Sequence, residues 1–61
     1  MQVKKKVLLI DDDKDFSQAT RMILEKGGYD VFLAEDGKAG VDMAKRIGPD
    51  LAIIDMMMET W

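Results

Sequence analysis

The chain alternates short runs of consecutive apolar residues with longer segments in which apolar residues recur at intervals of three or four. Residues 7–10 are four consecutive aliphatic residues, a pattern typical of a strand buried on both faces. Residues 29–34 and 51–55 hold similar apolar runs, centred on Val31, Phe32 and Leu33 in the second and on Ile53 and Ile54 in the third. The pattern therefore predicts three strands.

The segment after the first strand has helical spacing. Phe16, Ala19 and Ile23 recur at intervals of three and four, with Met22 beside Ile23, so we expect this apolar stripe to pack on a sheet. Either Asp13 or Asp15 can cap the helix, because a carboxylate accepts hydrogen bonds from the first N–H groups of a helix. Glycines at 27 and 28 predict its end.

A second helix is predicted from about Lys38 to Ile47. Asp36 can cap it, and the pair Gly48 and Pro49 ends it. The apolar spacing is weaker here, and Gly40 lowers the helix propensity. The resulting order, strand–helix–strand–helix–strand with short links, predicts an α/β fold with a parallel sheet and right-handed crossovers.

Composition narrows the functional classes. The chain has 61 residues, which fits one small domain, and a net charge of −3, which argues against a nucleic-acid surface. It contains neither cysteine nor histidine, so thiolate and imidazole metal sites and histidine catalysis are excluded. No apolar run approaches the roughly 18 residues that span a membrane, and no signal peptide is recognisable. We therefore expect a cytoplasmic protein.

Carboxylates follow two of the predicted strands directly. Asp11, Asp12 and Asp13 come after the first strand, and Asp55 ends the third. In open parallel sheets the carboxyl ends of the strands form the edge where ligands bind. Because capping a helix needs one acid only, the sequence predicts that Asp11, Asp12 and Asp55 form a site for a metal ion at this edge.

The acidic run at 11–13, the turn Asp36–Gly37 and the segment from Pro49 to Met58 together resemble the receiver domain of two-component response regulators. The resemblance covers essentially the whole chain. It implies a flavodoxin-like fold, here a three-stranded parallel sheet in the order 2-1-3 with helices on both faces. It also implies a phospho-accepting signalling domain rather than an enzyme.

The resemblance assigns roles to individual residues. Asp55 matches the phospho-accepting aspartate, and Asp11 and Asp12 match the acidic pair that holds Mg²⁺ together with Asp55. The backbone carbonyl of Met57 matches a further metal ligand. The implied partner is a sensor histidine kinase, whose phosphohistidine donates the phosphoryl group.

The resemblance also sets an expectation about extent. Receiver domains have five strands in the order 2-1-3-4-5, and only the first three are recognisable here, so residues 1–61 are interpreted as a truncated receiver domain. The positions of the family's hydroxyl residue and lysine, on the fourth and fifth strands, have no match. The alternative interpretation is a fragment without phosphotransfer that assembles through its third strand, either as a homodimer or with a chain that supplies the missing strands.

Overall fold

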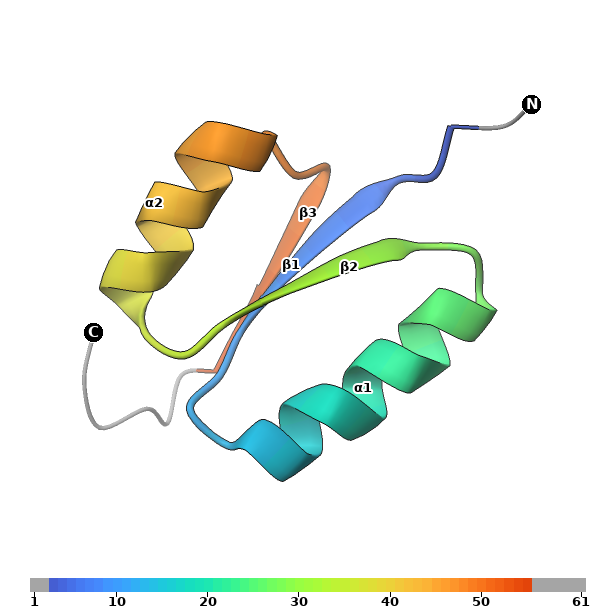
Figure 1. The fold of residues 1–61 in the computed structure, drawn as a ribbon, viewed down its shortest axis with the longest axis horizontal. Helices are drawn as coiled ribbons and strands as arrows, with labels where there is room; N and C mark the ends of the chain where they lie inside the picture. The colour runs from blue at the N-terminus through green and yellow to red at the C-terminus, as the bar shows by residue number, and fades with distance from the viewer. Residues whose placement is uncertain (1–2, 56–61) are drawn as a thin grey trace.

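A computed structural model describes residues 3–55 of the chain. It contains β1 (Lys6–Ile10), α1 (Lys14–Lys26), β2 (Asp30–Ala34), α2 (Gly37–Ile47) and β3 (Leu51–Ile54), shown in Figure 1. The predicted order of strands and helices is confirmed. Neither helix of the described residues is long and apolar enough to cross a membrane.

The three strands form one parallel sheet in the order β2-β1-β3. The central strand pairs on both sides, so that Leu9 lies beside Leu33 of β2 and beside Ile53 of β3. The central place of β1 explains its sequence, because its residues have neighbours on every side: Leu8 is 0% exposed.

The helices cover opposite faces of this sheet, with α2 on one side and α1 on the other (Figure 1). The predicted fold class is therefore confirmed: an α/β fold with parallel strands ordered 2-1-3 and two helices, as in part of a flavodoxin-like fold.

Aspartate side chains begin both helices. The Phe16 N–H donates to Oδ1 of Asp13 at 3.1 Å, so Asp13 rather than Asp15 caps α1. The Ala39 N–H donates to Oδ1 of Asp36 at 2.8 Å and caps α2 as predicted. Gly48 ends α2 in the left-handed conformation with φ of 57°, which favours glycine.

The α2 face of the sheet holds the main apolar core. Leu8, Ile10 and Ala34 are buried there, and Ala39, Met43 and Ala44 of α2 pack against them together with Phe32. Gly40 lets α2 approach closely, since a Cβ atom there would lie 2.8 Å from Cγ1 of Ile10 and closer still to Cδ1. The glycine that weakened the helix prediction is thus explained by packing.

The expected orientation of α1 is wrong. Ser17 is the buried residue of this helix, whereas Phe16 and Ile23 are 56% and 71% exposed. The crossover from β1 to β2 places α1 against β2, and this position presents Ser17, Thr20 and Leu24 to the sheet. The stripe of Phe16 and Ile23 lies about a quarter turn or more away around the helix.

β3 does not have the buried environment that its apolar sequence predicts. Its four residues are exposed, with Leu51 at 55% and Ile54 at 41%. Within residues 3–55 it pairs with β1 on one side only and forms the edge of the sheet.

Candidate metal centre

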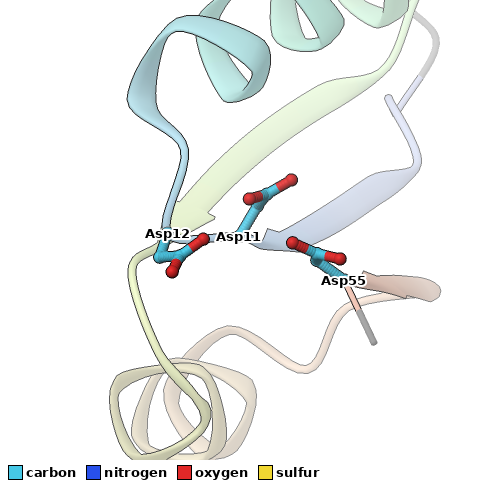
Figure 2. A group of neighbouring side chains, drawn as sticks. All are labelled: Asp11, Asp12 and Asp55. Carbon is cyan, nitrogen blue, oxygen red and sulfur yellow. The ribbon is translucent and has the colours of Figure 1, made fainter. Parts of the chain in front are cut away.

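Three carboxylates meet at the carboxyl edge of the sheet. Asp11 and Asp12 directly follow β1, and Asp55 directly follows β3. Each offers a carboxylate oxygen, and these three oxygens lie within 4.8 Å of one another. Figure 2 shows the side chains gathered where the two strands end.

Backbone hydrogen bonds fix the positions of these residues. The Asp11 N–H donates to the Ala34 carbonyl at 3.0 Å, and the Asp55 N–H donates to the Ile10 carbonyl at 2.9 Å. These bonds continue the pairing of β1 with both neighbours for one further residue. The sheet hydrogen bonds therefore hold the ends of β1 and β3 side by side. This places Asp11 and Asp55 next to each other at the carboxyl edge.

A second set of contacts orients Asp11. Its Oδ1 accepts a hydrogen bond from the Asp13 N–H at 2.9 Å. The side chain of Asp13 in turn caps α1. The backbone of Asp13 therefore orients Asp11, while its side chain begins the helix. Within the acidic run at 11–13, Asp13 is thus occupied by the helix cap, whereas the site roles of Asp11 and Asp12 stay predictions.

The environment of the cluster favours a bound cation. Asp11 is 5% exposed, Asp55 is half-buried and Asp12 is exposed. A buried carboxylate loses its hydration, and neighbouring carboxylates repel one another. A divalent cation would offset both costs, and an oxygen-only donor set open to water on the Asp12 side suits Mg²⁺. The residues present therefore fit this ion.

The structure brings together Asp11, Asp12 and Asp55, all predicted from the sequence. Their roles as metal ligands and phospho-acceptor remain predictions. Met57, the fourth predicted ligand, lies outside the described residues. Asp13 belongs to the helix cap.

A hollow of about 300 Å³ lies beside the carboxylates, between the start of α1 and the end of β2. Its lining residues are Asp11, Lys14, Ser17, Gln18, Leu33, Ala34 and Glu35. Lys14 Nζ lies 3.2 Å from Oε1 of Glu35 at its rim, and both side chains are largely exposed.

Lys14, Ser17 and Glu35 were not predicted from the sequence as neighbours of the carboxylates. Their proximity depends on how α1 is set against β2. The sequence held one signal for the side of α1 that faces the sheet, namely the helical spacing of Ser17, Thr20 and Leu24. The larger apolar residues on the neighbouring side of the helix favoured a different orientation.

A family model described as "Response regulator receiver domain" matches residues 7–61. This range includes every described strand and helix except the first residue of β1, together with all three carboxylates. No solved structure matches the chain.

Proposed function

Because the chain belongs to the response regulator receiver domain family, we propose that it accepts a phosphoryl group on Asp55 from a sensor histidine kinase. The observation that carries the proposal is the meeting of Asp55 with Asp11 and Asp12 at the carboxyl edge of a parallel sheet. Such an edge is where ligands bind in this class of fold.

The reaction would proceed by nucleophilic attack. A carboxylate oxygen of Asp55 forms a bond to phosphorus while the P–N bond of the donor phosphohistidine breaks, and the electron pair of that bond stays on the imidazole. The product is an acyl phosphate on Asp55. Its added negative charge is the signal that a partner would recognise.

Asp11, Asp12 and Asp55 would hold Mg²⁺, and the backbone carbonyl of Met57 is proposed as a further ligand. The ion would supply positive charge that reduces the repulsion between the Asp55 carboxylate and an anionic donor. The chain itself positions two of these carboxylates. The hydrogen bond from the Asp13 N–H holds Asp11 in place, and the hydrogen bond from the Asp55 N–H to the Ile10 carbonyl holds Asp55.

The protein would act as a signalling module, and the family is one of signalling modules. A receiver passes on the state of one residue and does not release a product after each turnover. We place it in the cytoplasm, where a kinase and its phosphohistidine would meet it.

Phosphorylation of the chain tests the proposal directly. The chain is incubated with Mg²⁺ and phosphoramidate, a small donor that contains a P–N bond, and the phosphoryl group is located by mass spectrometry. We expect one modified residue, Asp55, and no modification of Asp55→Asn. Asp42→Asn, which changes an exposed carboxylate of α2, is the matched control and should be labelled normally. Labelling elsewhere, or none at all, would contradict the proposal.

Metal binding is tested separately by calorimetric titration with Mg²⁺ alone. Replacing the buried ligand in Asp11→Asn should weaken binding by about tenfold or more. Asp15→Asn changes a neighbouring acid in the first turn of α1 that lies outside the cluster, and it should bind Mg²⁺ as the unmodified chain does. Equal affinities of the two variants would remove Asp11 from the site.

A further inference from the structure

We infer that Asp11 serves two structures at once, the carboxylate cluster and the start of α1, so that a cation at the cluster and the first turn of α1 stabilise each other. Asp13 is the positioning residue that joins the two. The inference rests on the metal centre proposed above, and it adds a route by which the state of that centre reaches a helix.

Asp13 makes hydrogen bonds in both directions. Its N–H donates to Oδ1 of Asp11 at 2.9 Å. Its own Oδ1 accepts from the Phe16 N–H at 3.1 Å, and its carbonyl oxygen accepts from the Ser17 N–H at 2.9 Å. The backbone angles of this one residue, φ of −86° and ψ of 103°, set the direction of all these groups. A rotation of Asp13 would therefore disturb the cluster and the helix together.

The sequence of the first turn explains the part that Asp11 plays there. In a capping box the third residue of the helix is Glu or Gln, and its side chain accepts the N–H of the cap residue. The third residue of α1 is Phe16, whose side chain has no acceptor atom. Oδ1 of Asp11 accepts the Asp13 N–H instead. Asp11 thus completes the cap of α1.

The same hydrogen bond prepares Asp11 for a cation. The backbone of this buried residue is fixed by the bond from its N–H to the Ala34 carbonyl, so its remaining freedom is rotation of the side chain. The Asp13 N–H restrains that rotation. A carboxylate has two oxygens, which leaves Oδ2 to bind a cation. A ligand that is held in place before the cation arrives binds it with a smaller loss of entropy.

Thermodynamic linkage makes the effect reciprocal. If the cap of α1 strengthens cation binding by some factor, the cation stabilises the cap by the same factor. The ends of helices open more readily than their centres, so the first turn of α1 is where a change in the cluster would be felt. Cation binding should therefore order the start of α1.

The second helix offers a comparison within the chain. Asp36 caps α2 as Asp13 caps α1, since the Ala39 N–H donates to Oδ1 of Asp36 at 2.8 Å. Ala39 is the third residue of its helix, as Phe16 is of α1. Because Oδ1 of Asp11 binds the start of α1, an effect transmitted through Asp11 should reach Phe16 and not Ala39.

Calorimetric titration with Mg²⁺ tests the role of the cap. Asp13→Asn and Asp13→Ala lose the same charge, but only asparagine keeps a side-chain oxygen that caps a helix. We expect Asp13→Asn to bind Mg²⁺ as tightly as Asp15→Asn does, and Asp13→Ala to bind it about tenfold more weakly. Equal affinities of the two Asp13 variants would overturn the inference and leave the metal centre in place. Absence of Mg²⁺ binding by the unmodified chain would overturn both.

Amide hydrogen exchange tests the reciprocal effect. Saturating Mg²⁺ should slow exchange of the Phe16 amide by about tenfold, the factor that linkage carries over from the titration, and should leave the Ala39 amide unchanged. In Asp13→Ala the response of Phe16 should disappear. Equal slowing at Phe16 and Ala39 would mean that the ion stabilises the whole fold, and it would contradict a link through Asp11.

A comparison without metal tests the cap alone. Asp11→Asn keeps an oxygen that can accept the Asp13 N–H, whereas Asp11→Ala does not. The Phe16 amide should exchange about fivefold faster in Asp11→Ala than in Asp11→Asn, which is the effect of losing one hydrogen bond of typical strength. Equal rates would remove Asp11 from the cap and overturn the inference.

These outcomes are separable from the proposed function. The metal-free comparison does not depend on the metal centre, and labelling of Asp55 is measured independently of both. Circular dichroism establishes that each variant is folded. If Asp13→Ala were unfolded, the comparison of the two Asp11 variants and that of Phe16 with Ala39 in the unmodified chain would still decide the inference.

Discussion

The two faces of the sheet are covered by helices of similar length but in different ways. On the α2 face, Ala39, Met43 and Ala44 point at the strands and join Leu8 and Ile10 in one core. On the α1 face, the residue most deeply buried in the helix is Ser17, while Phe16, Met22 and Ile23 remain exposed. α2 thus buries its apolar side and α1 does not.

The difference shows what hydrophobic periodicity leaves undetermined. Periodicity identifies a helix, but the crossover between paired strands decides which flank of the helix meets the sheet. In α2 the apolar flank and the contact flank coincide, and Gly40 permits close approach. In α1 the apolar flank and the contact flank lie on different sides of the helix. We therefore expect side chains on the α2 face to contribute more to the stability of the fold than those on the α1 face.

The largest expected effect follows from removing a core side chain on the α2 face. Leu8→Ala leaves a cavity beside Ile10 and Ala34 and should lower the free energy of unfolding by about 2–5 kcal/mol. Urea denaturation followed by circular dichroism measures the loss. Leu51→Ala, the same change on an exposed strand residue, is the control and should cost less than about 0.5 kcal/mol at dilute concentration. Equal losses would contradict a core centred on β1.

The second effect concerns the close approach of α2. Gly40→Ala should raise helix propensity by about 1 kcal/mol, yet the new methyl group meets the buried side chain of Ile10. Overpacking of this kind costs about 1–3 kcal/mol, so we expect net destabilisation in the same urea assay. Adding Ile10→Val removes the terminal methyl group and should recover part of the loss. A stabilised Gly40→Ala chain would show that α2 can move away from β1.

The third prediction, on the α1 face, is an increase in the free energy of unfolding rather than a loss. Ser17 is 4% exposed, and its Oγ has no hydrogen-bond partner among the described residues. Ser17→Ala removes this buried polar atom and should stabilise the fold by about 1 kcal/mol. Thermal unfolding measures the change, with Gln18→Ala as the exposed neighbour. A loss of stability would mean that the hydroxyl has a bonding partner, such as an ordered water.

The smallest effect is expected at the exposed stripe of α1. Ile23→Gln replaces a 71% exposed side chain and should change the free energy of unfolding by less than about 0.5 kcal/mol. A loss near that of Leu8→Ala would show that α1 turns its apolar stripe inward in solution, and the contrast between the faces would disappear.

Local chemistry made much of the structure predictable. The aliphatic run at 7–10 identified the central strand, and Asp36 with Gly48 marked the limits of α2 because their capping requirements are local. The meeting of Asp11, Asp12 and Asp55 was predictable as well, since the strands of a parallel sheet all end at a common edge.

What the sequence did not predict depends on distant contacts. The burial of Ser17 and the exposure of Phe16 follow from where α1 crosses β2. The apolar residues of β3 alone resemble those of β1, because a strand's composition does not reveal whether both of its sides are paired; only the strand order 2-1-3 implied by the family resemblance placed β3 beside a single neighbour. Whether Asp13 or Asp15 caps α1 depends on the conformation of the loop before the helix, which the sequence does not give.

The place of β3 at the edge also affects how the carboxylate cluster persists in time. Strands with few buried contacts open first in local unfolding, well before the whole domain does. Each opening of β3 would separate Asp55 from Asp11 and Asp12, which stay with the central strand. The lifetime of the assembled cluster would then equal the closed lifetime of one short strand, and the amide exchange rates of residues 51–55 would report it directly.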